Sequence, residues 1–356
     1  MGSLGHEKVT IAVIGAGVIG SHHASLVANC PDSCLSAIVD PTEAGRLLAE
    51  EYGCEYFTDT TGLLQSPSHV DAAIVCTPNS THEPISKLLS EYGIHLLIEK
   101  PVTTTVEEGK ALLKVCRQNG IRVCIGHHRR SHPSIEAAKQ SLDTGSIGQC
   151  IGVSGVWVAL KPNEYFNGPG AWHREKSGDV VLINLIHEVD LLQYLLGPIQ
   201  RVFAESSISS RGYAAEEGVA ITLKFTCGVV GTFLALDNAA SPFSIEGAIG
   251  ESPLYPFTGK DCYRFFGSRG TLTVPDGRLW QPECLDKGRL SGMKQSQLQW
   301  NHQDAYQRQV RNFINVARCL EEPVCSVVDG LSAVAVCEAV RRSLSEGSPV
   351  DVEQID

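Results

Sequence analysis

The chain has little of what marks membrane, nucleic-acid-binding or secreted proteins. No apolar stretch approaches the roughly 20 residues that span a bilayer, and basic residues cluster only in pairs such as Arg129-Arg130. The 356 residues carry a net charge of −11, whereas nucleic-acid binders usually present a basic face. Residues 1–8 are polar and lack the pattern of a signal peptide. We therefore expect a cytoplasmic protein with neither a membrane nor a nucleic acid as a partner.

The thirteen cysteines are odd in number and show no metal-ligand pattern. Some, such as Cys76 and Cys124, lie in apolar runs, where a thiol packs as a small hydrophobic group. Cys30 and Cys34 are four residues apart, but no second pair or histidine cluster completes a zinc set. We expect reduced thiols in a reducing compartment and no metal site.

The pattern of predicted elements changes near residue 127. Before it, short apolar runs alternate with helix-length segments, which is typical of parallel β-α-β units buried on both faces. These runs are Val9–Ile14, Cys34–Asp40, Cys54–Asp59, Ala72–Thr77, His95–Glu99 and Arg122–Ile125. We expect an α/β fold, with a parallel-sheet domain over residues 1–127.

Beyond residue 127, longer alternating runs predict an α+β domain over 128–356 with a large, open, mostly antiparallel sheet. The strongest helical pattern there is Val180–Leu196, which ends at Gly197-Pro198. The polar stretch Gln281–Trp300 is interpreted as a loop.

The most informative motif is a glycine-rich turn between the first apolar run and a helix. Gly15, Gly17 and Gly20 suit a tight turn, close approach to a pyrophosphate and close helix packing. The helix N-terminus favours negative charge. Asp40, at the end of the next apolar run, is placed to accept hydrogen bonds from a ribose diol. The predicted dinucleotide contacts here are Gly15, Gly17, Val18, Ile19, Gly20 and Asp40.

Asp40 favours NAD over NADP, because a 2′-phosphate would meet like charge. Pro41 follows, so no arginine stands there to bind a phosphate. Arg46 in the next helix keeps NADP open as the alternative.

Two further segments follow predicted strands of the first domain. One holds Thr77, Pro78, Asn79 and His82, and the other is Glu99-Lys100-Pro101. Since ligands bind outside the carboxyl ends of parallel strands, we expect both at the same crevice as the glycine turn. The further predicted dinucleotide contacts are Thr77, Pro78, Asn79, His82, Glu99 and Lys100. The structural alternatives are a helix cap at Ser80 or Thr81 and a surface lysine.

The third segment is the predicted helix 180–196. His187 lies there with Asn184 three residues before it and Asp190 three after, so all three share one face. Asp190 could fix the orientation of the imidazole. The alternative is a buried structural histidine.

Together these segments resemble the Gfo/Idh/MocA oxidoreductases, named from glucose–fructose oxidoreductase, inositol dehydrogenase and rhizopine catabolism. The resemblance covers nearly the whole chain. The matching motifs, in the family's order, are Gly15–Gly20, Thr77-Pro78-Asn79 with His82, Glu99-Lys100-Pro101, Gly126 through Arg130 to Pro133, His187 with Asp190, and Phe266–Leu272. The resemblance implies a Rossmann domain followed by an α/β domain whose open sheet forms a homodimer or homotetramer.

The resemblance also implies catalytic roles. Lys100 orients the reacting hydroxyl, and His187 accepts or donates its proton. The chain departs from the family at Ile183, where many members carry an aspartate four residues before the histidine. Asp179, in place of a glycine, either caps the helix or touches substrate. The predicted substrate contacts are Lys100, His128, Arg130, Tyr165, Trp172, Asn184 and His187.

The expected function is NAD(P)-dependent hydride transfer to or from a hydroxyl or carbonyl carbon of a sugar, cyclitol or related small molecule. One alternative is a redox-neutral enzyme that holds NAD tightly and oxidises its substrate transiently, for epimerisation, elimination or glycosidic cleavage. The other is a non-catalytic dinucleotide-binding regulator, against which the presence of both Lys100 and His187 argues.

Overall fold

The computed structural model describes residues 7–252 and 255–356, and the chain folds into two compact units. Unit 1 takes the chain up to Ser131 together with Ala305–Val334, and unit 2 takes His132–Asp304 and Ala335–Asp356. The first division falls four residues after the predicted boundary. The return of 305–334 to unit 1 has a physical reason: Phe313 and Ile314 of helix α9 (Ala305–Ala317) complete the apolar core of that unit.

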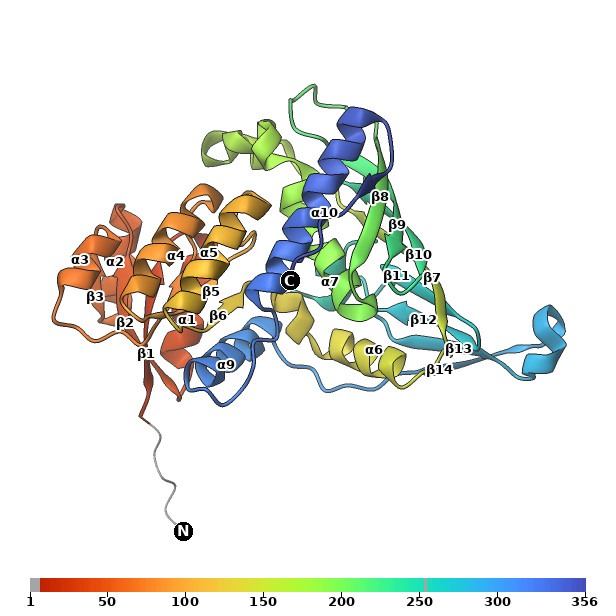
Figure 1. Cartoon of the computed structure of the whole chain (residues 1–356), viewed down its shortest axis with the longest axis horizontal. Helices are drawn as coiled ribbons and strands as arrows, with labels where there is room; N and C mark the ends of the chain where they lie inside the picture. The colour runs from red at the N-terminus through yellow and green to blue at the C-terminus, as the bar shows by residue number, and fades with distance from the viewer. Residues whose placement is uncertain (1–6, 253–254) are drawn as a thin grey trace, which may run out of the picture. The chain divides into compact units, whose positions relative to one another are not determined.

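Unit 1 is built on six parallel strands in the order β3-β2-β1-β4-β5-β6 (Figure 1). The strands are β1 Val9–Ile14, β2 Ser33–Val39, β3 Glu55–Phe57, β4 Ala72–Val75, β5 His95–Ile98 and β6 Val123–Ile125. The helices are α1 Val18–Asn29, α2 Glu43–Tyr52, α3 Thr60–Gln65, α4 His82–Glu91 and α5 Val106–Gln118. The strand order reverses between β1 and β4, which is where such sheets bind ligands. The predicted parallel domain is confirmed.

Unit 2 contains a nine-stranded sheet in the order β14-β13-β12-β11-β7-β10-β9-β8-β15. Only the β7–β10 pair is parallel among the pairs of this sheet in the described residues, so the predicted antiparallel character is confirmed. The strands are β7 Cys150–Val158, β8 Ile199–Ser206, β9 Gly218–Phe225, β10 Val230–Leu236, β11 Tyr263–Gly267, β12 Gly270–Val274, β13 Arg278–Pro282, β14 Met293–Gln297 and β15 Val350–Asp351.

The prediction of a loop over 281–300 is wrong. Strands β13 and β14 pair there as an antiparallel hairpin with a short 3-10 helix, η7 (Leu285–Leu290), between them. Figure 1 shows this hairpin extending away from the rest of the sheet. All five residues of β14 are exposed, so its sequence carries no alternation of apolar and polar residues.

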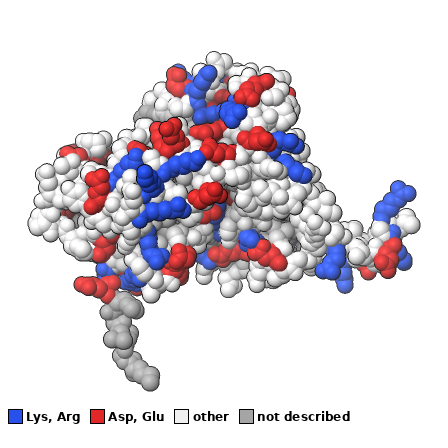
Figure 2. All heavy atoms as spheres, viewed as in Figure 1, with Lys and Arg blue, Asp and Glu red and all other residues white. Residues whose placement is uncertain are grey.

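The helices of unit 2 are α6 Pro133–Asp143, α7 Ile186–Leu196 and α8 Ile245–Ile249, and α10 (Val327–Glu346) passes from unit 1 into unit 2. Short 3-10 helices lie at η3 Asn163–Phe166, η4 Gly168–Arg174 and η5 Lys176–Gly178. No helix in the described parts of the chain combines the length and apolarity that crossing a membrane requires. Acidic and basic side chains are intermingled on the face shown in Figure 2.

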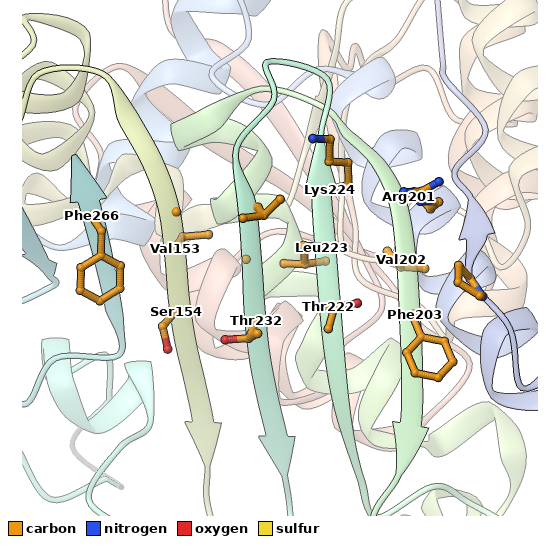
Figure 3. A pocket seen from close by; sticks show the side chains of 14 residues that line it. Val153, Ser154, Arg201, Val202, Phe203, Thr222, Leu223, Lys224, Thr232 and Phe266 are labelled. Carbon is orange, nitrogen blue, oxygen red and sulfur yellow. The ribbon is translucent and has the colours of Figure 1, made fainter. Parts of the chain in front are cut away.

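One face of the unit 2 sheet is open. Ser154, Thr232, Thr222 and Phe203 lie in one row across β7, β10, β9 and β8, where Figure 3 shows their side chains lining a shallow hollow. Apolar side chains on these strands remain exposed, with exposed fractions of 52% at Val230, 37% at Leu234 and 43% at Phe266. The opposite residues of β9, such as Val219 and Ile221, are buried.

Candidate functional site

The three glycines of the turn after β1 meet different constraints. Gly15 has a φ of +97°, and a Cβ there would lie 2.7 Å from the carbonyl oxygen of Cys76. A Cβ on Gly20 would overlap the carbonyl oxygen of Gly15. Around Gly17, by contrast, nothing lies within 4 Å of a Cβ position, so this glycine leaves open space beside the start of α1.

The start of α1 suits an anionic group. Gly17 is its N-cap and provides no side-chain hydrogen bond, and the first turn holds no acidic residue. The first N–H groups of any helix lack partners within the helix and attract negative charge. Val18, at the first position of α1, is 90% exposed. The turn therefore fits the pyrophosphate of a dinucleotide.

Asp40 follows β2 directly and lies against the glycine turn. Its Oδ2 accepts a hydrogen bond from the N–H of Ala16 at 2.7 Å, and its Oδ1 accepts one from the N–H of Thr42 at 2.8 Å. Arg46 was the residue that left NADP as an alternative cofactor, and it forms ion pairs with Glu43 and Glu50 on its own helix. The carboxylate is thus fixed next to the predicted pyrophosphate position, and no guanidinium among the described residues pairs with it.

The segment after β4 is tied to the segment after β5 through His82. Its Nδ1 lies 2.8 Å from the carbonyl oxygen of Pro101, and its Nε2 lies 2.8 Å from that of Thr77. Burial lowers the pKa of this histidine. The structure therefore brings both predicted segments together. His82 links them, because each of its ring nitrogens lies against a backbone carbonyl oxygen of one segment.

The side chain of Thr81 does not cap helix α4. Its hydroxyl oxygen lies 2.7 Å from the carbonyl oxygen of Pro78, to which it can donate, and 2.7 Å from Thr77 Oγ1, from which it can accept. Asn79 opens a short 3-10 helix, η1 (Asn79–Thr81), before α4.

Lys100 stands at the carboxyl end of β5, before a cis peptide bond to Pro101. The carboxylate of Glu99 holds the backbone of Lys100 in place. One of its oxygens lies 2.9 Å from Nε2 of His23, and the other accepts a hydrogen bond from the N–H of Lys100 at 3.2 Å. Burial would raise the pKa of Glu99, but the hydrogen bond with His23 and the electrostatic effect of His23, His128 and Lys100 together lower that pKa. A Cβ at Gly126 would lie 2.8 Å from Glu99, so a glycine is needed there.

His23 was not predicted as part of the site. It lies on α1, and no sequence spacing connects it to Glu99. The ring of Tyr306, from the distant helix α9, stands edge-on to His23 and stacks on His128 at a centroid distance of 3.8 Å. This packing explains why α9 belongs to unit 1.

His128 and Arg130 lie inside unit 1, with exposed fractions of 2% and 4%. Both belong to a 3-10 helix, η2 (His128–Ser131). Arg130 forms an ion pair with Asp329 at 3.1 Å and donates to the carbonyl oxygen of Val324. This placement does not support their predicted contact with substrate.

In unit 2, His187 lies near the start of α7 and is 8% exposed, and Asp190 is buried. The predicted helix 180–196 begins differently from expectation, with a π-helical turn, η6 (Val181–Leu185), that contains Asn184. Such turns occur frequently at functional sites.

Asp179 acts as the cap of this segment. Its Oδ1 accepts the N–H of Leu182 at 2.9 Å, and its Oδ2 binds Arg341 at 2.8 Å. Between the two predicted roles of Asp179, the structure therefore supports the cap.

Lys161, after β7, contacts the predicted substrate residue Asn184 and was not itself predicted as part of the site. Its Nζ donates to Oδ1 of Asn184 at 2.8 Å, lies 3.3 Å from Asp237 and stands 4.7 Å above the ring of Tyr165. Burial lowers its pKa. Its position directly after a long strand, like that of Lys100, is the signal that could have identified it.

The aromatic loop that follows Lys161 has both structural and exposed members. Tyr165 packs against His173 and under Lys161, whereas Trp172 is 43% exposed and stacks on His173 at 3.9 Å. In the described residues, no cluster of histidine, cysteine and acidic side chains suits a metal ion.

Known proteins resemble the chain over its whole length. The model for an oxidoreductase family with an NAD-binding Rossmann fold, Gfo/Idh/MocA, matches residues 9–127, and the model for the C-terminal α/β domain of this family matches 139–352. The chain is 25% identical to inositol 2-dehydrogenase of Rhizobium meliloti (strain 1021), over 97% of this chain and 99% of that protein. It is 26% identical to scyllo-inositol 2-dehydrogenase (NAD(+)) of Bacillus subtilis (strain 168), over 98% and 97%.

The fold has solved counterparts. The WlbA dehydrogenase from Bordetella pertussis, in complex with NADH and UDP-GlcNAcA, superposes with a TM-score of 0.79 at 21% identity, over 98% of this chain and 99% of that one. The chain therefore belongs to the Gfo/Idh/MocA family of NAD-binding oxidoreductases, which act on CH–OH groups.

Proposed function

We propose that this protein transfers a hydride between NAD(H) and a carbinol or carbonyl carbon of a sugar or cyclitol. The observation that carries the proposal is Lys100, anchored through Glu99 and His23 at the carboxyl end of the dinucleotide-binding sheet. Two inositol dehydrogenases that match nearly full length support a polyol as the substrate class.

The proposed chemistry divides between two side chains. Bound NAD would supply the hydride acceptor. The ammonium of Lys100 stabilises negative charge that develops on the reacting oxygen. The imidazole of His187 takes the hydroxyl proton in oxidation and returns it in reduction. Since Ile183 carries no charge, Asp190 is the acid of the helix that we assign to orienting His187.

We further propose that two copies associate through the open face of the unit 2 sheet. Val230, Leu234 and Phe266 leave apolar surface exposed on its strands, and exposed apolar patches commonly mark protein interfaces. A reducing compartment such as the cytoplasm fits the cysteines, none of which forms a disulfide in the described residues.

The decisive experiment follows NADH formation with purified protein, NAD and a panel of myo-inositol, scyllo-inositol and glucose. His187→Ala should lower kcat by about 10²- to 10⁴-fold while NADH still binds with unchanged affinity. His302→Ala is the matched control, because that histidine is exposed. Lys100→Met should likewise lose turnover, with the exposed Lys114 changed to Met as its control.

Full turnover by the His187→Ala variant would contradict the role assigned to this residue. Product formation without net NADH, from protein that holds stoichiometric NAD, would replace the proposal with a redox-neutral reaction.

A further inference from the structure

Lys161 holds a buried charge in a fixed place within unit 2. Its side chain is 10% exposed, and its backbone N–H donates to the carbonyl oxygen of Asp237 at 2.9 Å. The ammonium contacts Asn184, Asp237 and the face of the Tyr165 ring. A buried ammonium is stable only with such partners, so Lys161 has little freedom to turn.

The hydrogen bond between Lys161 and Asn184 determines which end of the Asn184 amide is left to bind a ligand. An ammonium only donates hydrogen bonds, so the carbonyl oxygen of Asn184 must face Lys161. The amide nitrogen, with its two hydrogens, then points elsewhere. Within the described parts of the chain no group accepts a hydrogen bond from this nitrogen, and Asn184 is partly exposed. Asn184 is therefore presented as a donor.

The helix brings this donor to the residue that we assign to proton transfer. Asn184 lies on the π-helical turn and His187 three residues later, near the start of α7. Residues three apart lie on one side of a helix. A substrate oxygen bound by Asn184 would thus neighbour the carbon on which His187 acts.

Carboxylates compensate the positive charge of Lys161 and of its neighbour Arg211. Arg211 donates to Oδ1 of Asp237 at 2.7 Å and lies 3.9 Å from Glu217, so Lys161 and Arg211 face two carboxylates. Glu246 adds a further negative charge in the vicinity of Lys161. Because Lys161 and Arg211 are already paired with carboxylates in the described part of unit 2, neither is left to bind a substrate carboxylate, whereas an uncharged oxygen needs only the donor.

We propose that Lys161 is a positioning residue that holds the Asn184 amide as a donor to an uncharged hydroxyl or carbonyl oxygen of the substrate, so that the site selects neutral polyols over sugar acids. This inference rests on the proposed function, because it takes the substrate to be a polyol.

The sharpest variant is Asn184→Asp, which retains an acceptor for Lys161 but removes both donor hydrogens. We expect its KM for a neutral polyol to rise about tenfold, with a smaller change in kcat and unchanged NADH affinity. Lys161→Met should raise KM similarly, Lys161→Arg should restore part of it, and the double variant should lose less than the product of the single effects. Lys176→Met is the matched control, since this lysine is exposed on the same loop.

Selectivity is measured on wild-type protein with glucose, myo-inositol and glucuronate, by turnover and by calorimetric binding to the NADH-loaded protein. Preference for glucuronate, or an unchanged KM in both Asn184→Asp and Lys161→Met, would overturn the inference while the oxidoreductase proposal stands. Binding of a neutral polyol that is lost in Asn184→Asp, without turnover in wild type, would support the inference and refute the proposed function. Binding of none of these compounds would overturn both.

Discussion

The imidazole of His23 and the carboxylate of Glu99 form a buried pair, with 2.9 Å between Nε2 and Oε1. Glu99 also accepts the N–H of Lys100, so a helix on one side of the sheet is connected to the lysine at its carboxyl edge. Fold stability and the position of a proposed catalytic side chain thus depend on the same carboxylate.

Replacement of His23 should therefore destabilise unit 1. His23→Leu removes the imidazole partner of the buried Glu99 carboxylate, and we expect the free energy of unfolding to fall by about 3 kcal/mol. Urea denaturation of the purified variant measures this loss. His69→Ala, which removes an exposed ion pair with Asp71, should cost less than about 1 kcal/mol. A His23→Leu loss no larger than that of this control would disprove the coupling.

Glu217 should make unit 2 sensitive to acid. Burial would raise its pKa, but hydrogen bonds from Ser210 and Ser209 outweigh it and lower the pKa from 4.5 to about 2. The pKa of Glu217 is lower in the folded state than in the unfolded state, so its carboxylate stabilises the fold above pH 4.5, by about 3 kcal/mol. This contribution is lost as the pH falls from 4.5 toward 2.

Denaturation curves at pH 5, 4 and 3 test this. Glu217→Gln should flatten the dependence of unfolding free energy on pH, whereas its neighbour's variant Glu216→Gln should behave as wild type. Parallel pH profiles for wild type and Glu217→Gln would contradict the expected linkage.

Asp40 should discriminate between the two nicotinamide cofactors. Wild-type protein should bind NADH more tightly than NADPH, because a 2′-phosphate would meet the carboxylate. Asp40→Asn keeps an acceptor for Ala16 but removes the charge, and we expect the NADPH-to-NADH affinity ratio to rise about tenfold. Fluorescence of the bound reduced cofactors measures both affinities, with the exposed Asp59→Asn as control. Tighter NADPH binding by wild type would refute this assignment.

The open sheet face should be needed for self-association. Phe266→Lys places a charge on that face (Figure 3), and we expect light scattering to give the mass of one chain for this variant and a multiple of it for wild type. Leu290→Lys changes an exposed leucine on η7, away from the face, and should leave the mass unchanged. A monomeric wild type would end the proposal.

Local patterns were sufficient to predict the parallel sheet. Both faces of β1 are buried, Ile11 and Val13 on one side and Ala12 and Ile14 on the other, which leaves an apolar run that a sequence pattern detects. Strand β14 could not be predicted in this way, because all of its residues are exposed and no apolar pattern marks it. The π-helical turn before α7 could not be distinguished from an α-helix, because its residues are mostly apolar in either case.

The site was predicted where a motif is local and missed where a contact spans the chain. The glycine turn, Asp40 and Lys100 follow from their places after strands. His23 with Glu99, and Lys161 with Asn184, are pairs 76 and 23 residues apart whose meeting depends on tertiary packing. Tyr306 and His128, which stack within unit 1, are even farther apart in the sequence.

The glycines of the motif are needed for two different reasons, which the sequence alone does not distinguish. Gly20 is required by the chain itself, since a methyl group there would occupy the place of the Gly15 carbonyl. Gly17 has a φ of −67° and empty space around its Cβ position, so the folded chain does not require a glycine there, and the requirement would come from a pyrophosphate that approaches the backbone closely. An alanine at position 17 would therefore yield a well-folded protein with a blocked pyrophosphate cradle, a ready-made cofactor-free reference state.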